Sequence, residues 1–434
     1  MNTQFIFKSI LAVAVVSMAS CKPELKDVTP SAGTANFSRY IAVGNSLTAG
    51  FADGGLYLEG QQNSYPEMIA AQMKTVGGGA FTSPFFNANQ ADGSGYLVLK
   101  SFTAAGTPVT ATQATNSAIR AQVTIPNVGS VNFLTKYTGE LNNYGVPGIK
   151  LALITYPEYG NLNPYFERLL AGNYGTNTTT YLNFITSKPW TFFSMWLGNN
   201  DVLGYATTGG ASAADAPTSK AAFTVLYNQA ANALTATGAK GVVATIPDVL
   251  TTPFFRTVTL SSLLAAVRVS APTVNAIYIQ TATGVRPATA SDYFLLTLSS
   301  ANLIGVPNAS SLPYGLHPGN PVESKWVLDQ AEAATVADYT NAYNATIKSV
   351  AAAKGLAVVD AYALLQQYGA GKEVNGVAVS AAFITGNLFS LDGIHLTQMG
   401  YSIIANEFIK SINSKYGSSI PIVDVTKYRG VKFP

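Results

Sequence analysis

The chain has 434 residues, of which 48% are hydrophobic and 11% are charged. Intrinsic disorder requires low hydrophobicity together with high net charge, so this composition excludes it. The formal net charge of +3 is too small for the positive field expected of a nucleic-acid-binding protein. With two His and one Cys, the sequence excludes a zinc finger, a His-rich metal site, an iron–sulfur cluster and an intrachain disulfide.

The first 20 residues have the organisation of an export signal peptide. Lys8 precedes an uncharged stretch at 10–20, which is too short to span a bilayer and has the length of a secretory signal core. Small residues then lead into Cys21, the only cysteine. This pattern resembles the lipobox of bacterial lipoproteins, in which the cysteine is acylated, although Met18 stands where Leu is usual. The alternative is an ordinary secretory signal with an incidental cysteine.

An acylated Cys21 would anchor the protein to the bacterial cell envelope, on the periplasmic or cell-surface side of a membrane. Residues 21–37 contain Pro, Gly, Ser and Thr without periodicity, so they predict a tether. The folded body is then expected at 38–434. No later stretch is apolar over the roughly 18 residues that a spanning helix needs, so no transmembrane helix is expected.

The body alternates between short apolar strands and amphipathic helices. This order is typical of a parallel sheet with crossover helices, and therefore of the α/β class. Ser64 and Glu67 have the spacing of a capping box and predict the start of the first helix. The expected strands are 40–43, 149–155, 190–197, 241–246 and 356–359, and the further helices are 220–235, 324–353 and 397–414.

Two segments interrupt this alternation. Residues 76–140 are rich in Thr, Asn, Gly, Ser and Val with alternating runs, which favours short antiparallel strands. Residues 251–322 mix apolar and Pro-rich pieces. We interpret both as insertions into the α/β frame. Because they follow the first and fourth frame strands, we expect them to wall a cleft at the carboxyl edge of the sheet.

The two histidines are the first candidates for acid–base chemistry. Asp392 lies three residues before His395, so on a loop its carboxylate can accept the Nδ1 proton and leave Nε2 free as a base. The alternative is that His395 is an ordinary surface-loop residue. His317 lies between Gly315 and Pro318, in the context of a turn, and is interpreted as structural.

Three further positions follow predicted strands or form turns near them. Ser46 comes directly after the apolar run 40–43 and Gly44, at the sheet edge where open α/β sheets bind ligands. Asn200 follows the strand at 190–197, and its amide could donate to a developing oxyanion. The turn at 142–148 could present a backbone N–H at a glycine. Each position alone is more typical of a simple turn than of a functional site. No Gly-x-Ser-x-Gly elbow occurs.

Taken in order, four motifs resemble the sequence blocks of the SGNH (GDSL-type) hydrolases. Asn45 stands where the family name has Asp, at a position that is not the nucleophile. The resemblance implies a three-layer α/β/α sandwich with a flavodoxin-like parallel sheet. It covers about 38–75, 142–250 and 324–417, and it leaves both insertions unexplained. The motifs are Gly-Asn-Ser-Leu at 44–47, Gly-Val-Pro-Gly at 145–148, Gly-Asn-Asn-Asp at 198–201 and Asp-x-x-His at 392–395.

The resemblance also implies roles for single residues. Ser46 matches the nucleophile, His395 the general base and Asp392 the residue that orients it. The Ser46 N–H, the Gly148 N–H and the Asn200 side chain match the oxyanion hole, although Gly145 is close enough to be confused with Gly148. The implied reaction is a two-step ester hydrolysis through an acyl-enzyme, with no metal and no organic cofactor.

Three functions stay open at this point. The first is an esterase or lipase that acts on acyl esters outside the cytoplasm. The second is a carbohydrate esterase that removes acetyl groups from a polysaccharide. The third is a non-catalytic surface lipoprotein, which is disfavoured because every catalytic position is filled. The expected partners are a small-molecule, lipid or glycan ester and, through Cys21, a membrane, with no nucleic acid.

The lipobox-like motif makes the first testable prediction. Cys21→Ala should move the protein from the membrane fraction to the soluble fraction, because the acyl chains that hold it would have no attachment site. Fractionation of cells that express each form, followed by immunoblotting, measures the shift. A wild-type protein that is already soluble after export would contradict the lipoprotein hypothesis.

Overall fold

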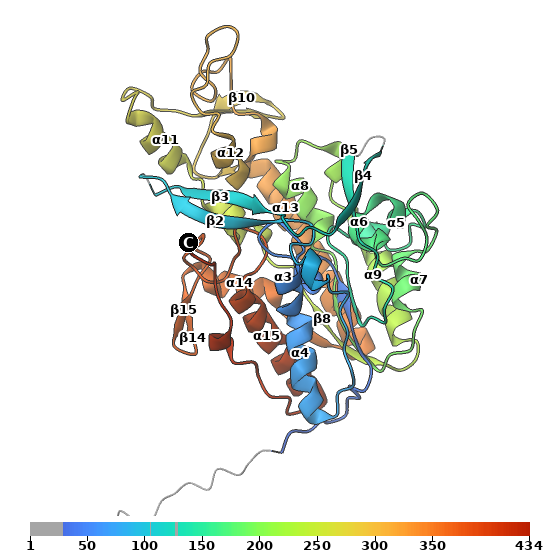
Figure 1. The fold of residues 1–434 in the computed structure, drawn as a ribbon. Helices are drawn as coiled ribbons and strands as arrows, with labels where there is room; N and C mark the ends of the chain where they lie inside the picture. Colours follow the sequence, from blue (N-terminus) through green and yellow to red (C-terminus); the bar gives the residue numbers. More distant parts are fainter. Residues whose placement is uncertain (1–28, 105, 126–128) are drawn as a thin grey trace, which may run out of the picture.

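The centre of the molecule is a five-stranded parallel sheet (Figure 1). The structure is a computed structural model and describes residues 29–104, 106–125 and 129–434. The strands lie in the order β13-β8-β7-β1-β6, so the first strand of the chain is flanked by the second and the third. This is the flavodoxin-like order, in which ligands bind beside the first strand, where the order reverses. The strands are β1 (Tyr40–Gly44), β6 (Asn143–Gly145), β7 (Phe192–Trp196), β8 (Lys240–Ala244) and β13 (Ala357–Val359).

Both faces of the sheet are covered by helices, so every residue of β1 and β7 is buried. Alternate side chains point to opposite layers. Val43 and Met195 belong to one core, with α8, α9 and α13, and Ala42 and Trp196 belong to the other, with α4, α14 and α15. The predicted three-layer α/β/α sandwich is confirmed. The helices are α4 (Tyr65–Met73), α8 (Asn200–Thr207), α9 (Lys220–Thr235), α13 (Gln330–Lys354), α14 (Ala361–Gly369) and α15 (Gln398–Tyr416).

The strand expected at 149–155 is wrong. The edge strand is β6, and the apolar run after it forms a 3-10 turn at Leu151–Leu153. Gly148 has a left-handed φ of +82° that ends the extended backbone. The run is apolar because Ile149, Leu151 and Ile154 are buried against the helix layer, and burial alone does not distinguish a strand from a turn.

Two predicted helix starts also need correction. The helix at 324–353 begins at Gln330, because the preceding residues form a short strand, and Asp329 with Glu332 makes its capping box. The capping box expected at Ser64 is absent, since the Ser64 side chain makes no cap hydrogen bond, although α4 is present. In contrast, α9 has the predicted bounds, and α15 is capped by Thr397.

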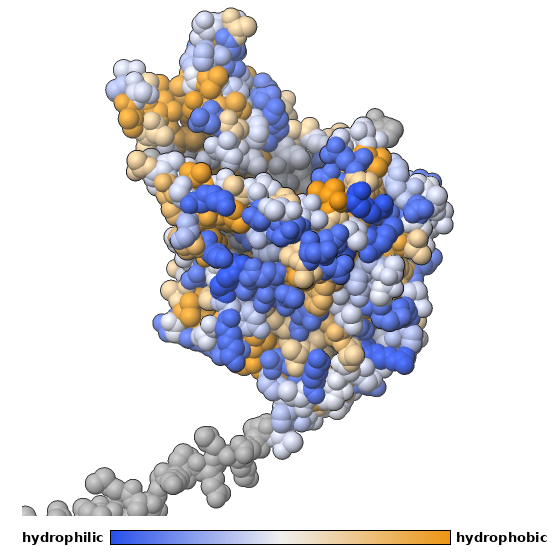
Figure 2. Space-filling model, in the orientation of Figure 1, coloured by the Kyte–Doolittle hydropathy of each residue, from blue (hydrophilic) through white to orange (hydrophobic). Residues whose placement is uncertain are grey.

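The insertion at 76–140 forms antiparallel hairpins, as predicted. The insertion at 251–322 has a small core of its own that includes Ile277, Ile279 and Leu298. Its elements form a lobe that stands out from the body in Figure 1, and Figure 2 shows a hollow in the molecular surface beside it. The hairpins pair β2 (Tyr96–Phe102) with β3 (Pro108–Gln113) and β4 (Ile119–Ile125) with β5 (Gly129–Leu134). The insertion contains α10 (Pro253–Arg256), α11 (Leu260–Arg268), β9 (Tyr278–Thr281), β10 (Gly284–Pro287), β11 (Tyr293–Phe294) and α12 (Leu296–Ala301).

Short elements complete the fold. These are α2 (Ser46–Ala49), α3 (Leu58–Gln62), α5 (Tyr159–Leu162), α6 (Pro164–Glu167), α7 (Tyr181–Ile185), β12 (Val327–Leu328), β14 (Lys372–Val374) and β15 (Val377–Val379). Within the described residues, no helix combines the length and the hydropathy needed to cross a membrane.

The tether predicted at 21–37 ends earlier than expected. Cys21 lies outside the described residues, but the last part of the segment is docked on the body. The Thr34 N–H donates to the Tyr416 carbonyl at 2.9 Å, and Phe37 is buried with its ring edge-on to Phe192. The chain therefore joins the body before residue 38, at the amino end of β1, because the apolar Phe37 belongs to the core.

Gly145 makes a prediction about stability. A Cβ at this position would lie 2.4 Å from the Ala49 backbone nitrogen, in the helix that follows β1. Gly145→Ala should therefore force α2 away from β6 and lower the free energy of unfolding by about 1–3 kcal/mol. Urea denaturation measures this change.

Gly369→Ala is the matched control, because Gly369 is helical and a Cβ there meets no heavy atom within 4 Å. It should leave the stability unchanged or raise it by up to about 1 kcal/mol. Equal unfolding midpoints for Gly145→Ala and the wild type would contradict the proposed packing of α2 on β6.

Candidate active site

Ser46 lies in a turn that only a glycine before it permits. A Cβ on Gly44 would lie 2.0 Å from Thr48 Oγ1, so the chain turns directly from β1 into α2. Ser46 is the first residue of α2, and Asn45 caps it by accepting the Leu47 N–H at 3.0 Å. Asn and Asp are equally good caps, so the Asn45 that departs from the family motif keeps this interaction.

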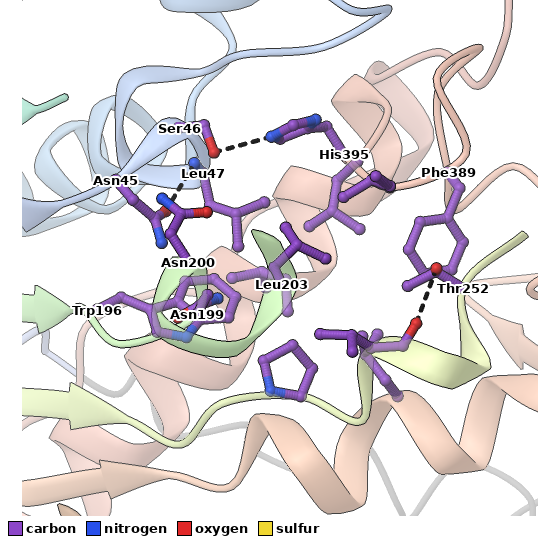
Figure 3. A pocket seen from close by; sticks show the side chains of 16 residues that line it. Asn45, Ser46, Leu47, Trp196, Asn199, Asn200, Leu203, Thr252, Phe389 and His395 are labelled. Atoms are coloured by element: carbon purple, nitrogen blue, oxygen red, sulfur yellow. Dashed lines mark hydrogen bonds between the residues drawn. The ribbon is translucent and has the colours of Figure 1, made fainter. Parts of the chain in front are cut away.

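His395 connects Ser46 to Asp392. Its Nε2 lies 2.8 Å from Ser46 Oγ, and its Nδ1 lies 2.8 Å from Asp392 Oδ2 (Figure 3 shows the Ser46 contact). An ionised carboxylate only accepts hydrogen bonds, so Nδ1 carries the proton and Nε2 accepts from the serine hydroxyl. The three side chains that the sequence singled out thus form one continuous hydrogen-bonded chain.

Asp392 is held as a carboxylate. Burial would raise its pKa, but the charge and the hydrogen bonds of His395 hold the pKa of Asp392 well below its ordinary value. Its Oδ1 accepts the backbone N–H groups of Ile394 and His395 at 2.9 and 2.8 Å, and its Oδ2 accepts the Gly54 N–H at 2.9 Å. The negative charge therefore persists at neutral pH and can stabilise a protonated imidazole.

The sequence did not predict the residues that hold the Asp392 carboxylate and its loop in place through hydrogen bonds. The Ser390 hydroxyl donates to Asp392 Oδ1 at 3.2 Å and accepts the Asp53 N–H at 2.9 Å. Asp53 in turn accepts the Leu391 N–H at 2.9 Å, and burial raises the pKa of this carboxyl. The Leu97 N–H in β2 donates to the Asp53 carbonyl at 2.7 Å. No sequence signal connects these residues, because their contacts are made only by the folded chain.

Asn200 connects the end of β7 to the turn after β6, on the two strands that flank β1. Asn200 begins α8 shortly after β7, and its Nδ2 donates to the Ile149 carbonyl at 2.9 Å. The second amide proton of Asn200 has no acceptor among the described residues. Figure 3 shows its side chain beside Ser46 and Leu47. The sequence thus placed Asn200 correctly at a strand end that faces Ser46.

The structure distinguishes the two glycines of this turn. Gly145 is buried, and its N–H donates to Asn143 Oδ1 at 3.0 Å. Gly148 is exposed, and among the described residues neither its N–H nor that of Ser46 has a protein acceptor. Gly148 rather than Gly145 therefore offers a free backbone donor.

Ser46 and His395 border a cavity with about 540 Å³ of empty space, part of it open to solvent. The first insertion was expected to wall the cleft, but no described residue of 76–140 lines this cavity. The second insertion contributes Thr252. Most of the lining is apolar (Figure 3). The apolar residues are Leu47, Trp196, Leu203, Pro247, Val249, Leu365, Phe389, Ile394, Leu396 and Ile404.

His317 is exposed in a turn of the second insertion, where its Nδ1 accepts the Gly319 N–H at 2.9 Å. This contact agrees with the structural interpretation of His317. Among the described residues, no group of three His, Cys, Asp or Glu side chains is placed to hold a metal ion.

A parallel sheet with a hydroxyl, an imidazole and a carboxylate at its carboxyl edge defines a hydrolase-type α/β protein. The model of the GDSL-like lipase/acylhydrolase family matches residues 40–408. The chain belongs to this family and is an ester hydrolase.

Comparisons with individual proteins give weaker likenesses. No curated protein matches the chain. An α/β hydrolase enzyme from the metagenome of Lake Arreo, Spain, is 11% identical, with a TM-score of 0.37 over 87% of this chain and 96% of the other. An extracellular lipase from Streptomyces rimosus is 13% identical, with a TM-score of 0.31 over 87% of this chain and 98% of the other.

Proposed function

We propose that the protein is a serine esterase that hydrolyses acyl esters through Ser46, His395 and Asp392. The observation that supports this most is the continuous hydrogen-bonded chain from the Ser46 hydroxyl through the His395 ring to the Asp392 carboxylate. A serine hydroxyl is a poor nucleophile at neutral pH and needs a base in contact with it. His395 is placed to be that base.

In the proposed reaction, Ser46 Oγ attacks the ester carbonyl while His395 Nε2 accepts the hydroxyl proton. The oxyanion that forms receives hydrogen bonds from the Ser46 N–H, the Gly148 N–H and the free amide proton of Asn200. His395 then donates its proton to the leaving alcohol, and an acyl-enzyme forms on Ser46. Water activated by His395 hydrolyses this ester and releases the acid. Asp392 stays ionised throughout.

The lining of the cavity favours a hydrocarbon acyl group. Each buried methylene contributes about 0.8 kcal/mol of transfer free energy, so an acyl chain gains affinity from these walls and an acetyl group gains little. This favours an esterase or lipase over the alternative, a polysaccharide deacetylase. We keep the export and the lipid anchor at Cys21 as part of the proposal, supported by the sequence pattern alone.

The nucleophile and base make the central prediction. Ser46→Ala and His395→Ala should each lower kcat by about 10⁴–10⁶-fold, because the attack loses its nucleophile or its base. The double variant should be scarcely slower than either single variant, since the two residues act as one unit. Release of p-nitrophenol from short-chain esters measures these rates.

His317→Ala is the control and should keep the wild-type rate. An organophosphonate ester should label Ser46, and mass spectrometry of the labelled peptide locates the site. Full activity of Ser46→Ala, or a label on another serine, would overturn the mechanism.

The cavity makes a separate prediction about the substrate. Leu203 is partly buried in α8 and lines the cavity, so Leu203→Trp should fill the acyl-binding space. The kcat/KM for a decanoate ester should then fall relative to that for acetate by roughly tenfold or more.

Val225→Trp on the exposed face of α9, where Val225 is 65% exposed, is the matched control and should leave this ratio unchanged. If Leu203→Trp also leaves the ratio unchanged, the acyl group binds elsewhere. Faster hydrolysis of acetylated polysaccharide than of any p-nitrophenyl ester by the wild type would favour the deacetylase alternative.

A further inference from the structure

Asp201 is a buried carboxylate that the proposed reaction does not use. It follows Asn200 in α8 and is 1% exposed. Its Oδ2 accepts the Leu151 N–H at 2.6 Å. Its Oδ1 accepts the Ala152 N–H at 3.1 Å and the Thr218 hydroxyl at 2.6 Å. Three donors from two distant segments therefore converge on one side chain.

The contacts of Asp201 with Leu151 and Ala152 hold one end of a single turn in place. The turn runs from Pro147 to Ala152 and contains Gly148. The Asn163 amide donates to the Pro147 carbonyl at 2.8 Å, and the Asn200 amide donates to the Ile149 carbonyl at 2.9 Å. Asp201 binds the backbone N–H groups of Leu151 and Ala152. The turn is thus fixed by side chains at both ends, and two of these side chains are neighbours in α8.

The chemistry of the position calls for a carboxylate. An Asn there would offer one acceptor oxygen, and its NH₂ group would face an N–H or hydroxyl donor. Burial raises the pKa of Asp201 to about 6, although the hydrogen bonds from Thr218, Leu151 and Ala152 act to lower it. The carboxyl of Asp201 ionises at about pH 3.8 in the unfolded chain but only at about pH 6 in the folded protein. The free energy of unfolding therefore falls as the pH rises between these two values. A buried charge with this cost to stability indicates a role beyond folding.

We propose that Asp201 is a positioning residue for the oxyanion hole. Its carboxylate fixes the turn at 147–152 so that the Gly148 N–H and the amide of Asn200 are directed at the same point beside Ser46. The inference rests on the proposed esterase mechanism and assigns Asp201 no contact with substrate. Because the oxyanion exists only after attack, a displaced turn weakens the transition state and leaves substrate binding almost unchanged.

The test compares Asp201→Asn with the wild-type enzyme after its turnover has been shown to depend on Ser46. The variant should lower kcat by about 10- to 100-fold, the cost expected of an oxyanion donor displaced by up to about 1 Å. KM should stay within about twofold. A trifluoromethyl ketone, which forms an oxyanion on Ser46, should bind more weakly by the same factor as the loss in kcat/KM.

Asp215→Asn is the matched control. Asp215 is a nearby carboxylate that pairs with the Lys150 side chain at 3.3 Å, and no backbone N–H of the turn donates to it. This variant should keep the wild-type kcat. If Asp201→Asn does not fold, Thr218→Val is the second variant. It removes one hydrogen bond to Asp201 and should lower kcat by about 2- to 10-fold without a change in KM.

A double-mutant cycle separates positioning from general damage to the fold. Asn200→Ala alone should lower kcat by about 10²–10³-fold. Adding Asp201→Asn to it should cost clearly less than it costs in the wild type, because both act on one hole. Multiplicative effects, a change confined to KM, or an unchanged kcat in Asp201→Asn or in Thr218→Val would overturn the proposal. Turnover that survives Ser46→Ala would instead overturn the esterase mechanism itself.

Discussion

The site depends on one imidazole that must touch a hydroxyl and a carboxylate at the same time. Ser46, which carries the hydroxyl, lies 349 residues before His395 in the sequence. The first and last parts of the α/β frame therefore have to meet at one edge of the sheet. Gly54, in the loop after α2, donates its N–H to Asp392 at 2.9 Å. The same carboxylate accepts the His395 N–H. Asp392 therefore ties the segment after β1 to the segment before α15, and the geometry of His395 follows from that tie.

The parts of the site that were predictable are local in the sequence. Asp392 and His395 are three residues apart, and Ser46 lies at the end of a buried strand, just after Gly44 and Asn45. This local spacing is enough to predict all three as candidate catalytic residues. The turn at Gly148 is predicted correctly, but the run at 149–155 is mispredicted as a strand because its apolar side chains are buried by distant helices. The support from Asp53 and Ser390 had no local signal, since these residues meet only after the frame has closed.

Both insertions are linked to the loop that carries Asp392 and His395, which their composition did not predict. In the first, Leu97 holds Asp53, which binds the Leu391 N–H. In the second, the Phe254 N–H donates to the carbonyl of Gly393 at 3.0 Å. The second insertion therefore binds the loop directly, whereas the first is linked to it by hydrogen bonds through Asp53. Of the two insertions, only the second lines the apolar cavity, through Thr252.

The docked segment places the start of the described chain at the amino end of β1. β1 runs for five residues from Tyr40, next to this segment, to the edge where Ser46 lies. At about 3.3 Å per residue, the two ends are separated by the full height of the sheet. The described chain begins at the opposite end of the body from the lobe (Figure 1). If Cys21 carries the proposed lipid anchor, the described chain would be attached at the end of the sheet opposite Ser46, and the site would be accessible to substrate from the surrounding medium or an opposing surface.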